Sequence, residues 1–212
     1  MTRPDGSYAI STLAQYSAEP TKTHLKIALR VLCYLKKTRE KGICYDGNGD
    51  LRIDTHSDAD WAGCKETRKS TTGYIIRAAG AAVSYISKKQ HSVSNSSTET
   101  EYVAAGATAR EIVWFQNLLN SIKEGLGINI PTAYRPMQLY LDNQAAIAIS
   151  KNPQYHSRMK HIDVQHHYIR ERVLEEDITP SYIPSADNAA DILTKPLSKE
   201  KHDGMKILLG IL

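Results

Sequence analysis

Four acidic residues of this sequence lie at the ends of predicted strands or on predicted helices. They are Asp58, Glu99, Asp142 and Asp191. Four carboxylates in one place repel one another unless cations neutralise them, and hard divalent ions prefer such oxygen ligands. Two such ions about 4 Å apart can activate a water molecule and stabilise the leaving oxygen when a phosphodiester is hydrolysed. The acids therefore indicate a metal-dependent hydrolytic site.

Each acid also has a structural alternative. An acid after a strand is often a turn former or the cap of the next helix, and an acid in a first helical turn complements the helix dipole. Two neighbours compete with the four: Asp60 would share the face of Asp58 on a continuing strand, and Glu101 would point away from Glu99 on a helix. Spacing alone leaves the membership of the site open.

The elements that would position these acids follow from the periodicity of the apolar residues. Helical spacing predicts helices at Pro20–Lys37, Ser97–Ile122 (with Ser97 or Thr98 as cap), Gln144–Ser150, His161–Glu175 and Ala189–Thr194. Short segments between turn residues predict strands at Ile43–Asp46, Leu51–His56, Gly73–Arg77, Ala82–Ser87, Met137–Leu141 and Pro180–Ile183. An antiparallel meander followed by crossover strands predicts an α/β fold, in which strand ends and helix starts converge on one surface.

Composition is that of an ordinary globular protein. The 212 residues are 41% hydrophobic and 24% charged, which suits one domain with a sizeable core, alone or with one appendage. The formal net charge of +4 permits a nucleic-acid partner without requiring one. Three widely spaced cysteines, Cys33, Cys44 and Cys64, argue against a disulfide framework and favour a reducing compartment. The sequence has no bilayer-length apolar run and no signal-peptide pattern, so we expect no membrane partner.

Seven motifs in order resemble the ribonuclease H region of Ty1/copia-type retrotransposon Pol polyproteins. They are Ser57-Asp58-Ala59-Asp60-Trp61-Ala62-Gly63, Arg68-Lys69-Ser70-Thr71-Thr72-Gly73-Tyr74, Ser87-Lys88-Lys89-Gln90, Ser96-Ser97-Thr98-Glu99-Thr100-Glu101-Tyr102, Asp142-Asn143-Gln144-Ala145-Ala146, Lys160-His161-Ile162-Asp163 and Ala190-Asp191-Ile192-Leu193-Thr194-Lys195-Pro196-Leu197. Each motif alone is weak, but the ordered set is specific. Upstream, Thr2-Arg3-Pro4-Asp5 and Arg30-Val31-Leu32-Cys33-Tyr34-Leu35-Lys36 resemble the end of the reverse transcriptase thumb and connector.

The resemblance implies a ribonuclease H-like fold: a mixed five-stranded sheet flanked by helices, with a small N-terminal helical appendage. It divides the chain into a thumb and connector remnant at 1–41, a ribonuclease H-like domain at 42–198 and a C-terminal tail at 199–212. No Tyr-x-Asp-Asp polymerase motif occurs, so a polymerase domain is expected in cis or in trans.

Carried over position by position, the resemblance assigns the catalytic acids and metal ligands to Asp58, Glu99, Asp142 and Asp191. It implies two Mg²⁺ ions, with Mn²⁺ as a substitute. It favours these acids over Asp60, over Glu101 and over Asp187, which is a lesser rival of Asp191. Many ribonucleases H carry a mobile histidine after the last strand that assists product release. The corresponding stretch, 183–187, contains no histidine, so turnover is expected to rely on another group, or on none.

Small polar and cationic residues near these acids are candidates for substrate contact. An RNA/DNA hybrid presents 2′-hydroxyls in a wide minor groove and phosphates along both strands. The candidates are Arg68, Lys69, Ser70, Thr71, Lys88, Lys89, Gln90, Ser97, Asn143, Lys160 and His161. The alternative for the basic pairs Arg68-Lys69 and Lys88-Lys89 is that they lie on a solvated surface without contacting a substrate. The alternative for Asn143 is that it caps the following helix. The histidines at 156, 161, 166 and 167 lack a nearby cysteine, which disfavours a structural zinc site.

The resemblance implies cleavage within the RNA strand of RNA/DNA hybrids during retrotransposon replication, with 5′-phosphate and 3′-hydroxyl products. It implies an intracellular location, in cytoplasmic virus-like particles or in the nucleus. The alternatives are a non-catalytic connection-like module that holds the hybrid, which the four acids disfavour, and an integrase of the same superfamily, which the motif string and the lack of a His/Cys zinc module disfavour.

Overall fold

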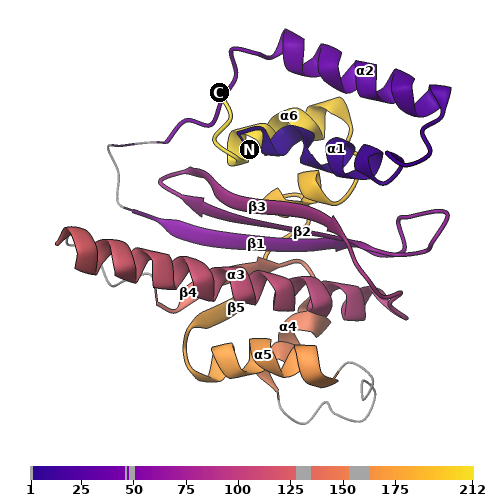
Figure 1. Cartoon of the computed structure of the whole chain (residues 1–212). Coiled ribbons are helices and arrows are strands. Elements are labelled where there is room, and N and C mark those ends of the chain that lie inside the picture. The colour runs from indigo at the N-terminus through magenta and orange to yellow at the C-terminus, as the bar shows by residue number, and fades with distance from the viewer. Residues whose placement is uncertain (1, 46, 48–50, 128–134, 153–162) are drawn as a thin grey trace.

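A five-stranded mixed sheet forms the centre of the molecule. The computed structural model describes residues 2–45, 47, 51–127, 135–152 and 163–212 (Figure 1). The strands are β1 (Ile53–Asp60), β2 (Thr71–Ala78), β3 (Ala81–Lys89), β4 (Met137–Leu141) and β5 (Ile178–Tyr182), in the order β3-β2-β1-β4-β5. Strands β1 to β3 are antiparallel neighbours, whereas β4 runs parallel to β1 and β5 parallel to β4. The predicted α/β class with a mixed five-stranded sheet is confirmed and is consistent with a ribonuclease H-like fold.

Helices cover both faces of this sheet (Figure 1). On one face lie α3 (Ser97–Leu126), α4 (Gln144–Lys151) and α5 (Asp163–Leu174). On the other lie α1 (Ser7–Ala14), α6 (Lys199–Leu208) and the 3₁₀ helices η1 (Pro4–Gly6) and η5 (Ala189–Leu193), with α2 (Lys22–Lys37) outermost. In the part of the chain described, no helix is long and apolar enough to span a membrane.

Alternation along β2 divides the core between the two faces. Successive side chains of a strand point to opposite sides, so the fully buried neighbours Ile75 and Ile76 enter different clusters. Ile76 packs with residues of α3, β4 and α5. Ile75 packs with residues of η5 and α6, among them Leu193 and Met205. Truncating such a residue to alanine typically destabilises a fold by about 2–5 kcal/mol.

Several predicted bounds of strands and helices differ from those in the structure. Strand β1 extends to Asp60, so Asp58 lies inside the strand rather than after it. The predicted strand at Ile43–Asp46 is not part of the sheet; Ile43 makes an isolated antiparallel bridge to Ile211. Two helices escaped prediction, α1 and α6, because each is short and places few large apolar residues in the core.

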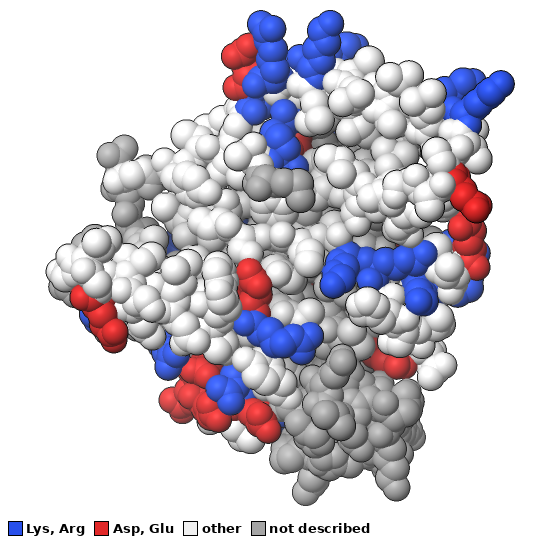
Figure 2. Space-filling view, in the orientation of Figure 1, with Lys and Arg blue, Asp and Glu red and all other residues white. Residues whose placement is uncertain are grey.

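The two ends of the chain pack together on the α6 face. Gly42 and Leu212 exchange backbone hydrogen bonds of 3.3 and 3.2 Å, and Arg3 donates to Thr38. Helix α2 contributes little to either core, since none of its residues is buried. Figure 2 shows Lys and Arg side chains along the upper edge of this view, where α2 lies, and a second group to the right of centre.

Candidate metal centre

Asp58 lies near the end of the central strand with its side chain buried. It is 1% exposed and faces Gly73 across the β1–β2 ladder. The hydroxyl of Thr194, just after η5, donates to Oδ2 of Asp58. A carboxylate removed from water in this way needs compensating charge or hydrogen bonds. The charged neighbours of Asp58 are the carboxylates of Asp142 and Asp191 and the ammonium group of Lys195.

Asp142 is brought to Asp58 by parallel pairing. It directly follows β4, and β4 pairs in parallel with β1, so both strands end at the same edge of the sheet. The next residue, Asn143, is the N-cap of α4 and accepts a hydrogen bond from the backbone of Ala146 at 3.0 Å. Asp142 is half-buried and accepts a 2.6 Å hydrogen bond from Ser185. The helix cap predicted as the alternative for Asn143 is therefore present.

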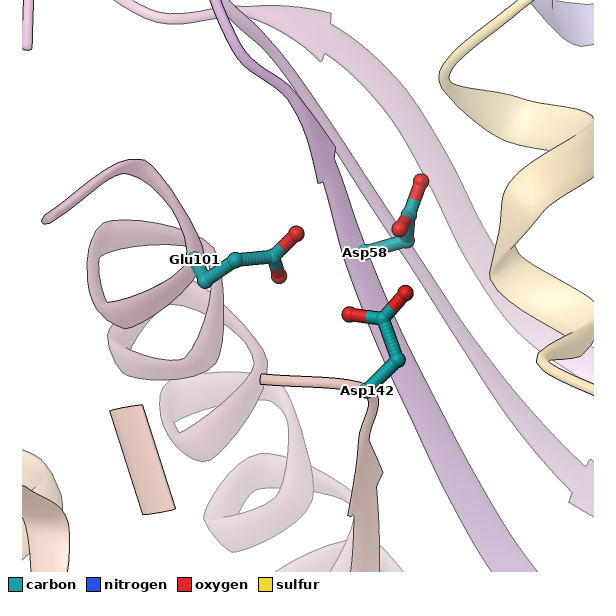
Figure 3. A group of neighbouring side chains, drawn as sticks. All are labelled: Asp58, Glu101 and Asp142. Atoms are coloured by element: carbon teal, nitrogen blue, oxygen red, sulfur yellow. The ribbon is translucent and has the colours of Figure 1, made fainter. Parts of the chain in front are cut away.

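Glu101 completes the group from α3. One carboxylate oxygen of each of Asp58, Glu101 and Asp142 lies within 4.8 Å of the others, the one such group found among the described residues (Figure 3). Glu101 is 6% exposed, and its Oε1 accepts a hydrogen bond from the backbone of Ala59 at 3.2 Å. Its Oε2 is buried without a hydrogen-bond partner. An orphaned buried oxygen facing two carboxylates fits a hard cation as the missing partner.

The structure brings Glu101, rather than the predicted Glu99, to the other two carboxylates. Glu99 belongs to the helix start: its backbone N–H donates to Ser96, and its Oε2 accepts from the backbone of Asn95 at 2.8 Å. The cap is thus Ser96 rather than Ser97 or Thr98. A serine followed three residues later by glutamate is the pattern of a capping box. That pattern is present at Ser96–Glu99 and would have assigned Glu99 to the cap.

Asp191, the fourth predicted acid, is fully buried beside Asp58 but is paired with lysines. Lys195 Nζ lies 2.8 Å from its Oδ1 and 3.6 Å from Oδ2 of Asp58. Lys201 Nζ lies 2.5 Å from Oδ2 of Asp191. Neither lysine was predicted as a site residue, although Lys195 belongs to the last of the seven motifs, Ala190–Leu197. The spacing of four residues between Asp191 and Lys195 is the sequence feature that could have predicted this ion pair. No such spacing relates Lys201 to Asp191, because Lys201 lies on α6.

Burial and like charge raise two pKa values in this group. Burial, assisted by repulsion from Asp58 and to a smaller extent from Asp142, raises the pKa of Glu101 to about 9. Burial also raises the pKa of Asp58 to about 6, because the attraction of Lys195 compensates only in part. For Lys195, burial lowers the pKa, but Asp58 and Asp191 outweigh it, so the net shift is upward. Positive charge at this centre would favour the ionised acids.

The rival acids lie outside the carboxylate group. Asp60 is half-buried in β1, where burial raises its pKa. It packs so closely on Gly63 that a Cβ there would meet its Oδ2 at 1.8 Å. Asp187 is exposed in the loop before η5. Asp60, although it lies two residues from Asp58 on the same strand, thus packs against the turn that follows β1 and is not a member of the carboxylate group.

The predicted substrate-contact residues fall into three groups. Exposed residues are Arg68, Lys88 and Ser97, half-buried residues are Lys69, Thr71, Lys89 and Asn143, and buried residues are Ser70 and Gln90. Ser70 forms hydrogen bonds with Ala62 and Thr100. Gln90 forms hydrogen bonds with Thr72, Thr100 and Ser94. Both side chains are therefore engaged in internal bonds: Ser70 holds the loop after β1, and Gln90 links β2, α3 and the segment before α3. Contact of these two residues with a substrate stays a prediction. Lys160 and His161 lie outside the described residues.

Comparison with known proteins finds retrotransposon Pol polyproteins that match nearly the whole chain. The chain is 40% identical over 210 residues to the retrovirus-related Pol polyprotein from transposon RE1 of Arabidopsis thaliana, covering 99% of the chain and 14% of that polyprotein. It is 37% identical over 210 residues to the polyprotein from transposon TNT 1-94 of Nicotiana tabacum, covering 99% and 15%. It is 39% identical over 211 residues to the polyprotein from transposon RE2 of Arabidopsis thaliana, covering 100% and 14%. The chain thus spans about one seventh of these relatives. No family model matches it.

Proposed function

Because this chain is homologous over nearly its full length to Pol polyproteins of copia-type retrotransposons, we propose that it is their ribonuclease H. The proposed activity is endonucleolytic hydrolysis of the RNA strand of an RNA/DNA hybrid during reverse transcription. The proposal implies a reverse transcriptase polymerase domain in cis or in trans, and an intracellular site of action in cytoplasmic virus-like particles or the nucleus.

One observation carries the proposal: three carboxylates from β1, α3 and the end of β4 converge at one edge of the sheet (Figure 3). Asp58 and Glu101 are buried, whereas Asp142 is half-exposed. A purely structural polar group of this kind would pair its acids with donors. Here Oε2 of Glu101 has no hydrogen-bond partner, and the acids repel one another. The half-exposed Asp142 gives the group access to solvent, as a site acting on a phosphodiester requires.

Asp58, Glu101 and Asp142 are the residues that would hold a divalent cation, Mg²⁺ or Mn²⁺. Oxygen-only ligands match the preference of these hard ions. Such ions, when bound, supply Lewis-acid stabilisation of the phosphodiester and a more acidic water nucleophile. In this proposal Glu101 takes the role that the sequence analysis gave to Glu99. Asp191 remains the fourth acid of the site and acts through Lys195, which lies within 4 Å of both Asp191 and Asp58.

The remaining residues of the site orient these acids. Thr194 donates to Asp58, Ser185 donates to Asp142, and the backbone of Ala59 donates to Glu101. Each bond fixes one oxygen of its carboxylate. Because water is the proposed nucleophile, no covalent intermediate with the protein is needed. The residues thereby preorganise a charge-dense centre, which is the main way in which such sites stabilise a phosphoryl-transfer transition state.

Exposed residues beside the acids supply the proposed contacts to the hybrid. Arg68 lies in the loop between β1 and β2, Lys88 near the end of β3, and Ser97 at the start of α3. Cations suit the phosphates, and small hydroxyl groups suit the 2′-hydroxyls of the RNA strand. The half-buried Lys69 lies in the same loop between β1 and β2, and Thr71 begins β2. Asn143, also half-buried, directly follows Asp142 at the start of α4.

The test is cleavage of a hybrid whose RNA strand is labelled, with the purified full chain in Mg²⁺ and in EDTA. We expect Mg²⁺-dependent cuts within the RNA strand that leave 5′-phosphates, and no cuts in single-stranded RNA or duplex DNA. Asp142→Asn keeps the side-chain shape but removes a ligand charge, so it should abolish cleavage while hybrid binding persists. A parent chain that binds hybrid without cutting it in Mg²⁺ or Mn²⁺ would contradict the proposal and favour a connection-like module.

A further inference from the structure

The four acids of the site do not form one equivalent set. Asp58, Glu101 and Asp142 approach one another to within 4.8 Å. Asp191 instead has each of its oxygens on an ammonium group: Oδ1 is 2.8 Å from Lys195 and Oδ2 is 2.5 Å from Lys201. The structure therefore divides the site into three carboxylates that face one another and a fourth, Asp191, that is paired with two lysines.

Lys195 joins these two parts. Its Nζ is also 3.6 Å from Oδ2 of Asp58, so one ammonium group stands between a member of the carboxylate group and Asp191. The Lys195 side chain is 32% exposed, whereas the side chains of Asp58 and Asp191 are 1% and 0% exposed. The ammonium group thus covers two buried acids from the solvent side. A cation bridging Asp58 and Asp191 would need the same position.

The charges of the site agree with this division. The four acids carry four negative charges when ionised, and Lys195 and Lys201 offset two of them. A single divalent ion on the carboxylate group would offset the remaining two. A second divalent ion would leave the buried site with an excess of positive charge, which desolvation makes costly.

We propose that Lys195 occupies the second cation position of the site, between Asp58 and Asp191, so that the substrate-free chain binds one divalent ion and not two. This inference rests on the proposed function, because it assumes that Asp58, Glu101 and Asp142 hold a metal ion. Lys195 then acts as a positioning residue that neutralises Asp58 and Asp191 in place of a metal. A second ion gains these two ligands only when the ammonium group withdraws from them.

Counting bound Mn²⁺ on the full chain without nucleic acid tests the proposal. Equilibrium dialysis, with free Mn²⁺ measured by electron paramagnetic resonance, gives the number of ions per chain. We expect one tight ion for the parent and two for Lys195→Met, which keeps the length of the side chain but removes its charge. Lys195→Arg keeps the charge and should remain at one. Two tight ions on the parent, or one on a folded Lys195→Met, would overturn the proposal.

Lys201→Met is the matched control. Lys201 pairs with Asp191, whereas in the described part of the chain Lys195 pairs with both Asp191 and Asp58. The Lys201 variant should therefore still bind one ion, and a count of two would show that loss of any charge at Asp191 suffices, against the proposal. If Lys195→Met folds poorly alone, it is refolded in Mn²⁺, where the second ion should restore the fold; failure to recover would count against the proposal.

The outcomes separate this inference from the proposed function. A parent chain that binds no Mn²⁺ would remove the metal site and with it both conclusions. A parent chain that binds one ion and cleaves hybrid, beside a folded Lys195→Met that also binds one ion, would overturn the role of Lys195 alone. The binding count does not depend on catalytic activity, so a change in cleavage rate cannot imitate either result.

Discussion

Glu99 and Glu101 illustrate how much depends on a rotation of one helix about its axis. Two residues along an α-helix differ by about 200° in direction, so only one of the pair can face the sheet. Glu99 caps the start of α3 through Asn95, and Glu101 faces Asp58 and Asp142. At the scale of single residues, the identity of the third carboxylate is thus a geometric result, and isosteric amides can test it.

Glu101→Gln is expected to lower kcat for hybrid cleavage by at least about 100-fold, since loss of outer partners of metal ligands alone costs 10–100-fold. Glu99→Gln should stay within about 3-fold of the parent, because glutamine also serves in a capping box. Single-turnover cleavage rates of the two variants, with circular dichroism to confirm folding, measure this. Equal losses in both variants, or the reverse order, would reject the assignment of Glu101.

The raised pKa values of Glu101 and Asp58 predict how stability depends on pH without metal. Both values, about 9 and about 6, exceed the ordinary values of 4.5 and 3.8, so the folded state retains protons that the unfolded state releases. Unfolding is therefore favoured increasingly as pH rises from about 4 towards 9. Between pH 5 and pH 8 the two shifts together amount to about 5 kcal/mol. In EDTA, the melting temperature should therefore fall by roughly 10–20 °C over this range, at about 2–4 °C per kcal/mol.

The control for this pH effect is Glu101→Gln, which should remove most of the fall because its amide does not titrate. Added Mn²⁺ should raise the melting temperature more at pH 8 than at pH 5, since the ion requires ionised ligands. Calorimetry in buffers of matched ionic strength gives both quantities. A melting temperature in EDTA that rises over this range would contradict the burial of uncompensated acids.

At the scale of elements, the contact between β2 and η5 positions half of the site. Gly73 on β2 pairs with Asp58 on β1, and η5 crosses directly over it. A Cβ at Gly73 would meet Thr194 Cγ2 at 2.6 Å and Leu193 Cβ at 2.8 Å. Glycine therefore allows the close approach that brings Thr194 and its neighbours to Asp58.

Gly73→Ala is expected to cost about 1–3 kcal/mol through overpacking and to weaken Mn²⁺ binding by displacing η5. Gly204→Ala is the matched control: nothing lies within 4 Å of a Cβ there, and its place inside α6 should make alanine slightly stabilising. Urea denaturation and the Mn²⁺ count above measure the two effects. A Gly73 variant as stable as the parent would show that η5 adjusts without cost.

At the scale of the whole molecule, charge distribution bears on the substrate more than net charge does. A net charge of +4 is small, but Arg68 and Lys88 are exposed on segments that end near the acids. The carboxylate edge of the sheet lies at one end of α3, whereas Lys123 lies near its other end, roughly 33 Å from Glu101 at 1.5 Å per residue. Cations at the two ends should therefore contribute differently to hybrid binding.

The chain is expected to bind hybrid more tightly than duplex DNA, with affinity falling about 10- to 100-fold between 50 and 200 mM salt, as a few phosphate contacts require. The double variant Arg68→Ala/Lys88→Ala should reduce the slope of log affinity against log salt by about 1–2. Lys123→Ala serves as the control and should leave the slope unchanged. Fluorescence anisotropy in Ca²⁺ measures binding without turnover; equal affinity for both duplexes at every salt concentration would contradict the expectation.

The sequence alone determined the α/β class, and most strands and helices, because burial imposes a period of two on strands and 3.6 on helices. It also predicted that Asp58 and Asp142 belong to one site, since each lies at or just after the end of a predicted strand. The parallel pairing of β1 with β4 brings these two positions to one edge of the sheet. The lysine four residues after Asp191 was visible too, although its partner Asp58, 137 residues upstream, was not. These features are local, or follow from a single pairing.

Only the tertiary structure decided which face of α3 meets the sheet. Of the large apolar residues along this helix, Ile112 and Leu119 are buried, whereas Val103 and Val113 are half-buried and Leu118 is 38% exposed. The face in contact carries Tyr102 and small residues, among them Ala105, all fully buried. Small side chains let the helix approach the sheet closely, and this close packing outweighs the burial of isolated large residues. That choice turned Glu101 towards Asp58 and left Glu99 to the cap. Long-range packing likewise brought Lys201 of α6 to Asp191, which no local pattern encodes.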